Sequence, residues 1–258
     1  MKKIYILMFI ITLLSCNAYV QAAQVGSMIS VPLDIVEADR LSINAEGSIV
    51  SEINLDTKNG ISNSVDESTQ IGLKISYGIT EGVSFYAKLG MADWSITNST
   101  PMTTEYENAP YYGGGISYVY RSESNILVGG DIQYIMQSGV DVDSITYSNT
   151  AAANITGLEG DFNTMQISVL LGYDLELSED MRIVPYGGLT YSKFEYESAA
   201  GSFTAGSTIN QAAQSLDSDD VLGFIAGLSL KMGSNLDITL EERFVAESAF
   251  SIGFNYRF

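Results

Sequence analysis

The sequence contains no histidine, and its only cysteine, Cys16, lies close to the N-terminus. Histidine is the usual general base near neutral pH, so Ser-His-Asp and Cys-His nucleophilic sites are excluded. Zinc sites built from histidine and cysteine are excluded as well. The scarcity of thiols fits an oxidising compartment. The sequence therefore predicts a non-enzymatic protein without a cofactor or a metal.

Basic residues are also scarce: 12 lysines and arginines stand against 31 aspartates and glutamates, giving a formal net charge of −19. Binding to nucleic acid depends on lysine and arginine neutralising phosphates. Nucleic acid is therefore excluded as a partner.

Long apolar runs are absent apart from residues 4–14, which follow the basic start Met1-Lys2-Lys3. Eleven residues are too few for a membrane helix, which needs about 20. A basic start, a short apolar run and the small residues of Val20-Gln21-Ala22 are typical of a cleaved signal peptide. The competing interpretation is a lipoprotein signal, Leu13-Leu14-Ser15-Cys16, with lipid on Cys16.

The sequence thus predicts three parts, and export of the last two. Residues 1–22 are the signal peptide, residues 23–39 a periplasmic lead-in, and residues 40–258 a single all-β domain. Because only helices and closed barrels satisfy every backbone group in lipid, a membrane location would require a barrel.

Alternation of apolar with polar or small residues is the dominant signal of this domain. From Met165 to Leu177, seven apolar residues occupy every second position over thirteen residues. An ordinary strand has five or six residues, whereas a membrane-crossing strand is long and tilted. Ten segments follow the pattern: 41–55, 71–79, 83–91, 112–120, 126–136, 165–177, 181–196, 222–232, 236–240 and 250–258.

The connections between these segments alternate between long and short. Four long connections fall at 57–67, 96–109, 138–163 and 197–219, and tight turns separate the other pairs. Long outer loops and short periplasmic turns are expected of an antiparallel up-and-down transmembrane β-barrel. We predict ten strands. Eight strands are the alternative if the short connection after Val245 is no hairpin, and a secreted β-sandwich is the competing fold.

In this register, charged side chains of both signs face the lumen. The balance is expected because an unpaired buried charge costs several kcal/mol. The predicted lumen network contains the acids Glu46, Asp131, Asp174, Glu176 and Glu241, together with Glu52, and the bases Lys74, Lys88, Arg121, Lys231, Arg243 and Arg257. Outward tyrosines and phenylalanines such as Tyr77 and Phe85 would form the aromatic girdles of such a barrel.

The last strand alternates and ends on an aromatic residue, with Phe254, Tyr256 and Phe258 on one face. It resembles the closing strand of bacterial outer-membrane β-barrel proteins, in which a terminal aromatic is an assembly signal. Residues 110–118 and 185–191 resemble the Pro-Tyr-Gly strands of small opacity-protein and surface-antigen barrels. The resemblance implies an outer-membrane location, contact with lipid and lipopolysaccharide, and the barrel-assembly machinery as a partner.

Some ten-strand barrels are proteases that need a histidine, and the sequence has none to carry that activity. The outer acids Asp141 and Asp143 lack the spacing of a calcium loop, so we expect them to be solvated. We favour a structural or surface-contact barrel, and a narrow pore for ions or small solutes is the main alternative. A histidine-free enzyme built on loop carboxylates is a third and least favoured class. The oligomeric state is left open.

Overall fold

The computed structural model describes residues 33, 35–58, 60–245 and 248–258, with only the backbone given at residues 52, 53 and 58. The predicted signal peptide with Cys16, and residues 23–32 and 34 of the lead-in, lie outside the described residues. So does the side chain of Glu52.

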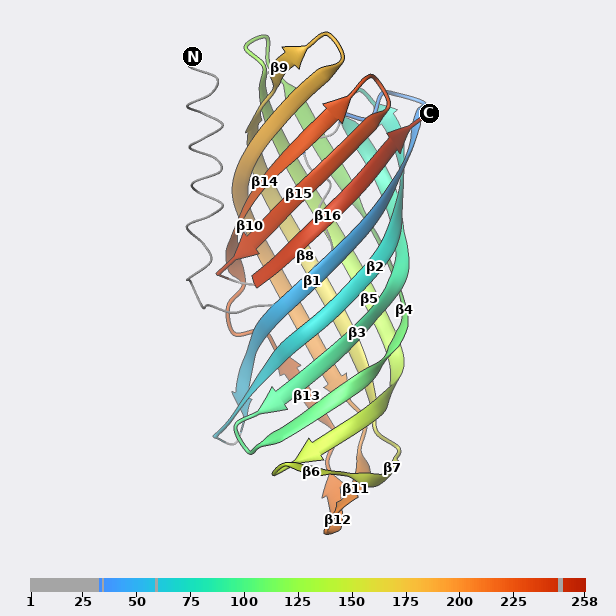
Figure 1. Ribbon diagram of the computed structural model, residues 1–258, viewed down its shortest axis with the longest axis vertical. Coiled ribbons are helices and arrows are strands. Elements are labelled where there is room, and N and C mark those ends of the chain that lie inside the picture. The colour runs from blue at the N-terminus through green and yellow to red at the C-terminus, as the bar shows by residue number, and fades with distance from the viewer. Residues whose placement is uncertain (1–32, 34, 59, 246–247) are drawn as a thin grey trace.

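Ten antiparallel strands close into a barrel, in which each strand pairs with the next and the last pairs with the first (Figure 1). Closure is made by β16 on β1, where Ser42 lies opposite Arg257. This ring confirms the predicted ten-strand barrel and excludes the eight-strand and sandwich alternatives. The strands are β1 (Leu41–Lys58), β2 (Ile61–Thr80), β3 (Val83–Asn98), β4 (Met102–Arg121), β5 (Ile126–Tyr147), β8 (Glu159–Tyr173), β10 (Met181–Ser198), β14 (Leu222–Met232), β15 (Leu236–Phe244) and β16 (Ser248–Arg257).

The two ends of the barrel differ. The short turns between β2 and β3, β4 and β5, and β14 and β15 share one end with the C-terminus, and we call it the turn end. The opposite hairpin end carries the short strands β6 (Thr150–Ala151), β7 (Ala153–Thr156), β11 (Gly201–Ala205), β12 (Ser207–Gln211) and β13 (Gln214–Asp217). Among the described residues, no helix is long and apolar enough to cross a membrane.

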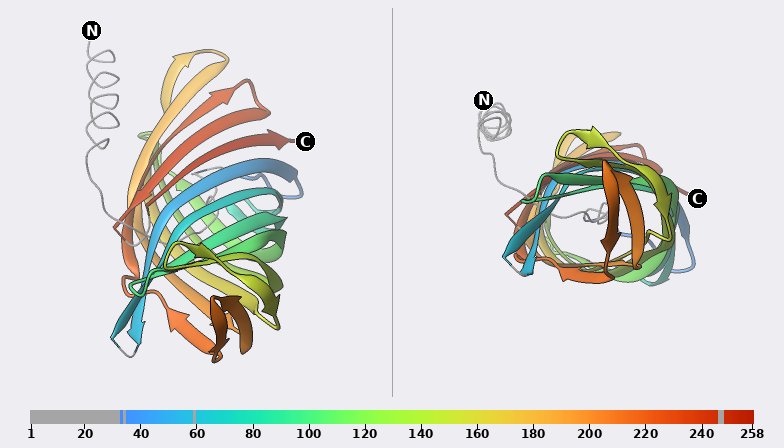
Figure 2. Two further views of the ribbon diagram at one scale, coloured as in Figure 1. Left: turned by 60° about the horizontal axis from the view of Figure 1, so that its bottom comes forward. Right: turned by 90° about the horizontal axis from the view of Figure 1, so that it is seen from below.

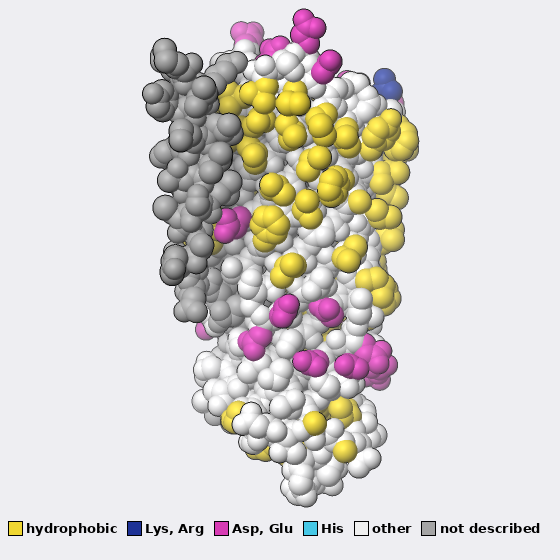
Figure 3. All heavy atoms as spheres, viewed as in Figure 1, with side chains coloured by type: hydrophobic (Ala, Val, Ile, Leu, Met, Phe, Trp, Pro, Cys, Tyr) yellow, Lys and Arg dark blue, Asp and Glu magenta, His cyan; other side chains and the backbone are white. Residues whose placement is uncertain are grey.

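An apolar belt surrounds the half of the barrel near the turn end (Figure 3). Outward residues such as Ile71, Val169 and Leu222 are about 60% exposed or more, whereas inward residues beside them, Gln70, Ser168 and Gly223, are buried. The predicted girdle residues, Tyr77 and Phe85 among them, are on this outer face. This is the arrangement of a barrel whose outside contacts lipid.

The four long connections, expected as loops, consist largely of strand. For example, β3 continues to Asn98 and β4 begins at Met102, so the interval 96–109 is mostly a hairpin. With 22 residues, β5 has about twice the 9–11 residues that a tilted strand needs to cross the hydrocarbon core. The strands therefore project well beyond the belt at the hairpin end.

The pattern of hydrophobicity reverses where the strands leave the belt. On β3, Leu89 and Met91 point outward, whereas Ala92, Trp94 and Ile96 beyond them point inward and are buried. Outside a membrane, the outer face meets water and the interior must supply the apolar core. The predicted segment 83–91 stops at this reversal, because one constant apolar face is expected of a membrane strand, whereas β3 continues to Asn98.

Pro185 lies inside β10. The partner of β10 changes at this point from β9 (Leu175–Ser178) to β8, and Pro185 pairs only with Leu228 of β14. Proline has no backbone N–H, and at this break between the β9 and β8 pairings its absence costs no ladder hydrogen bond.

At the hairpin end, β13 completes the projecting wall. The strands β14, β15 and β16 are short and do not reach this part of the wall. Beyond their ends, on the hairpin side, β13 pairs with β10. Ser218, just after β13, forms a bridge to Leu55 of β1. A sheet of β12, β11 and β7 packs Phe203 against Ile145 and Leu158. We call residues 144–158 and 199–216 the cap. Seen from the hairpin end, the β11–β12 hairpin crosses the mouth of the ring (Figure 2).

The lumen as the candidate functional site

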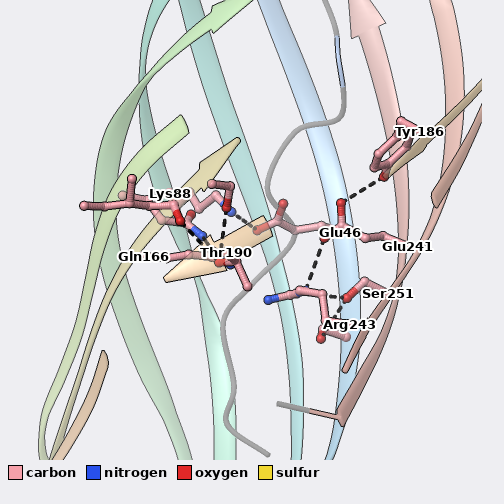
Figure 4. Close-up of polar contacts among 12 residues, drawn as sticks. Glu46, Lys88, Gln166, Tyr186, Thr190, Glu241, Arg243 and Ser251 are labelled. Atoms are coloured by element: carbon pink, nitrogen blue, oxygen red, sulfur yellow. Dashed lines mark hydrogen bonds and ion pairs between the residues drawn. The ribbon is translucent and has the colours of Figure 1, made fainter. Parts of the chain in front are cut away.

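The middle of the lumen is a layer of buried charged and amide side chains, which we call the polar layer (Figure 4). Lys88 Nζ on β3 lies 3.2 Å from Glu46 Oε1 on β1, and both side chains are at most 2% exposed. Arg243 Nε lies 3.2 Å from Glu241 Oε1 on the same strand, β15. Inward positions two strands apart, or on one strand, thus place opposite charges together, as such burial requires.

Tyrosines link these charges across the lumen. The Tyr86 hydroxyl donates to both carboxylate oxygens of Asp131, at 2.9 and 2.8 Å, and Lys74 Nζ lies 3.4 Å from the centre of its ring. The Tyr186 hydroxyl donates to Glu241 Oε2 at 2.8 Å. A cation over an aromatic face and hydrogen bonds to carboxylates both stabilise buried charge.

Glycines make room for the tyrosine rings. A Cβ atom on Gly115 would lie 2.4 Å from the Tyr86 hydroxyl oxygen, and one on Gly227 would lie 2.2 Å from Cζ of Tyr186. Gly115 and Gly227 therefore admit large lumen side chains that a larger residue would exclude.

The other predicted network residues lie near the turn end. Asp174 is buried and forms ion pairs with Arg121 and with Arg182 Nη1, the latter at 3.4 Å. Arg257 Nη2 lies 2.9 Å from Asp237 Oδ1. Sequence reasoning missed Arg182 and Asp237, although each stands between two apolar residues on an alternating strand.

Lys231 is buried, whereas Arg121 and Glu176 are exposed at the rim. Glu176 lies opposite Arg182 where β9 pairs with β10, and it is exposed in this pairing at the turn end. The other residues of β9 are also largely exposed.

An aromatic layer fills the lumen on the hairpin side of the polar layer. Trp94 stacks on Phe162 with ring centres 5.0 Å apart, and Phe194 lies 5.1 Å from Trp94. Tyr106 meets Phe162 edge-on at 5.1 Å and exchanges a hydroxyl hydrogen bond with Tyr196. The layer comprises Val50, Leu55, Val65, Trp94, Ile96, Tyr106, Val140, Phe162, Phe194, Tyr196, Leu216 and Ala249.

The chemistry of the aromatic layer is that of a packed core. Burial raises the pKa of the Tyr106 hydroxyl far above its ordinary value, and burial likewise raises the pKa of Tyr196. Both phenols therefore stay protonated at physiological pH. This layer does not follow from the expected polar lumen face, because its residues are apolar at inward positions.

A second apolar layer closes the lumen at the turn end. It contains Leu33, Val119, Leu127, Leu170, Val184, Tyr186 and Ile225. Leu33 comes from the N-terminal lead-in and is 2% exposed. Part of the lead-in thus lies inside the barrel.

The residues of the predicted assembly signal lie on the outside of β16. Phe254, Tyr256 and Phe258 are about half exposed, and the rings of Tyr256 and Phe258 meet edge-on at 5.0 Å. The Phe258 amide donates to Leu41 O at 3.0 Å, next to the seam between β16 and β1. Their role in assembly stays a prediction.

No metal site stands out in the described part of the chain, where no group of three or more carboxylate, histidine or cysteine side chains could hold an ion. Asp141 and Asp143 are exposed.

No protein-family model matches the sequence, and no curated protein matches it either. Solved barrels of similar shape include the translocator domain of the autotransporter NalP from Neisseria meningitidis, at 13% identity and a TM-score of 0.49, covering 85% of this chain and 88% of that one. The outer membrane protein OprG from Pseudomonas aeruginosa has 12% identity and a TM-score of 0.45, covering 86% and 97%. Ail, the attachment invasion locus protein of Yersinia pestis, has 13% identity and a TM-score of 0.31, covering 85% and 99%.

Likenesses this distant carry no functional argument, and the strand pairing of the chain itself establishes its fold. A closed antiparallel barrel with an apolar outer belt and a polar middle is the architecture of bacterial outer-membrane proteins.

Proposed function

We propose that the protein is a non-enzymatic outer-membrane barrel with a sealed lumen, which holds its cap rigidly outside the cell for a structural or surface-contact role. In this proposal the turn end faces the periplasm, following the rule for short turns in such barrels. The belt contacts lipid and lipopolysaccharide, and the barrel-assembly machinery inserts the chain.

The aromatic layer is the observation that carries the proposal. Trp94, Phe162 and Phe194 come from three different strands, and their rings meet at van der Waals separation inside the lumen, on the hairpin side of the polar layer. Interiors packed in this way leave few voids that can admit water. Ions in transit would therefore have to displace several buried rings.

The chemistry of the cap supports surface contact. Residues 144–158 and 199–216 contain no charged side chain, in a chain with a net charge of −19. Between cap and belt, the projecting wall carries exposed acids, and Figure 3 shows carboxylates gathered beyond the belt on one face. The exposed acids of the wall include Asp66, Glu67, Glu105, Glu107, Asp141, Asp143, Glu159 and Glu197. Uncharged serine, threonine, asparagine and glutamine side chains at the tip can make hydrogen bonds without charge repulsion.

A narrow pore for ions or small solutes is the second candidate, and the charged polar layer favours it. Swelling of proteoliposomes in small sugars separates the two functions for solutes. The sealed barrel predicts swelling no faster than that of empty liposomes. A variant that combines Trp94→Ala, Phe162→Ala and Phe194→Ala with deletion of residues 23–37 loses both the aromatic layer and the Leu33 side chain of the second apolar layer. It should swell faster, which shows that the assay can detect an open lumen. Rapid swelling with the unaltered protein would favour the pore.

A further inference from the structure

The N-terminal lead-in enters the barrel at the turn end, where the wall fits it closely. Leu33 packs among Val119, Leu127, Leu170, Val184, Tyr186 and Ile225, and Ile35 packs against the same cluster. Val36 is 4% exposed. These side chains occupy the mouth through which the polar layer would otherwise meet the periplasm.

Glycines in the wall provide the space for this segment. A Cβ atom on Gly129 of β5 would lie 2.4 Å from Leu33 Cδ2, and one on Gly172 of β8 would lie 2.3 Å from Leu33 Cδ1. On β2, a Cβ atom on Gly78 would lie 2.1 Å from the Glu37 carbonyl oxygen. Any larger residue at these three inward positions would collide with the segment.

Among the described residues, few hydrogen bonds hold the segment to the wall. Lys231 Nζ donates to Leu33 O at 3.3 Å, and a turn at Asp39, with φ at 60°, leads into β1. The Asp39 amide donates to Gly78 O at 2.9 Å. The ladder that closes the barrel, in contrast, pairs β1 with β16 from Ser42 opposite Arg257 to Glu52 opposite Ser248. The segment can therefore leave without disturbing the ring.

We propose that residues 33 and 35–37 are a removable plug, and that Gly78, Gly129 and Gly172 belong to a socket built for it. The socket accepts an aliphatic side chain on an extended segment, and its occupant is the chain's own Leu33. Withdrawal of the plug opens the polar layer to the periplasm, while the aromatic layer still closes the outer side. The inference rests on the proposed function, in which the aromatic layer seals the outer side of the lumen.

The test reads the accessibility of a thiol behind the plug. Ser168 is 1% exposed on the lumen face of β8, one inward position deeper than Leu170. With the predicted signal peptide removed, the mature chain has no cysteine, so Ser168→Cys introduces a single thiol. A small water-soluble thiol reagent should label it slowly in the folded barrel.

Two alterations of the plug should speed the labelling: Leu33→Asp, and deletion of residues 23–37. We expect about a tenfold to hundredfold increase in rate, as follows from losing the burial of one leucine side chain. The matched control Glu37→Gln alters an exposed side chain of the plug and should leave the rate unchanged. Ser124→Cys, in an exposed turn at the same end, should react equally fast in all backgrounds.

A disulfide supplies the second measurement. In a Leu33→Cys/Gly129→Cys variant, oxidation should lock the segment in place and a reductant should release it. Failure of that disulfide to form, or equal labelling of Ser168→Cys with and without the plug, would overturn the inference and leave the sealed lumen intact. Ion conductance on deletion of the plug would instead overturn the aromatic seal while the plug inference stands.

Discussion

The ion pair between Lys88 and Glu46 gives the sharpest prediction about stability. Its atoms lie 3.2 Å apart, and the two side chains are 0% and 2% exposed. Lys88→Met keeps most of the side-chain volume but leaves the Glu46 carboxylate without its cation. Removing one partner of a buried pair costs about 3–5 kcal/mol. The folded-to-unfolded ratio should therefore fall by about 10²- to 10⁴-fold.

The single tryptophan provides the assay. Trp94 is buried in the aromatic layer, so its fluorescence reports unfolding of the barrel in urea from phospholipid vesicles. The double variant Glu46→Gln/Lys88→Met removes both charges and should recover most of the loss. Asp66→Asn, an exposed change on the wall, should stay within about 0.5 kcal/mol of the unaltered protein. A loss below about 1 kcal/mol for Lys88→Met would refute the buried pair, since such values are typical of exposed pairs.

Four further predictions concern other parts of the barrel. Gly227→Leu should destabilise the barrel because its side chain meets the Tyr186 ring, and Tyr186→Ala should relieve part of that loss in the same urea titration. Phe194→Ala should cost about 3–5 kcal/mol, the usual effect of truncating a buried phenylalanine, whereas equal stability would contradict the packed aromatic layer. Deletion of Phe258 should lower the amount of barrel assembled in cells, measured by heat-modifiable migration on gels, without preventing folding into vesicles. Protease added to intact cells should cut only beyond the belt, and cleavage within 165–177 would contradict the topology.

The fold was largely predictable from the sequence because the belt strands obey one rule. Lipid outside and a polar lumen inside give every second residue the same character, as from Met165 to Leu177. Counting such segments was enough to predict ten strands and the inward positions of Glu46, Lys88 and Arg243.

The projecting wall was not predictable by the same rule, because water replaces lipid outside it. Trp94 and Phe194 are apolar at inward positions, so they broke the expected pattern and were assigned to no face. The change of phase between Met91 and Ala92 is nevertheless present in the sequence.

The plug was beyond sequence reasoning for a different reason. Leu33 and Val36 stand in a short segment without clear periodicity, and their burial depends on glycines contributed by β5, β8 and β2. Only the closed barrel brings Gly129 and Gly172 to the same apolar side chain.

Single-channel recording in planar bilayers tests the sealed lumen most directly, because ions are smaller than any sugar. The purified full-length barrel should insert without reproducible conductance steps. The variant with Trp94→Ala, Phe162→Ala and Phe194→Ala should conduct once residues 23–37 are also deleted, because both apolar layers are then opened. Regular steps from the unaltered protein, at a size that this combined variant does not increase, would contradict the aromatic seal.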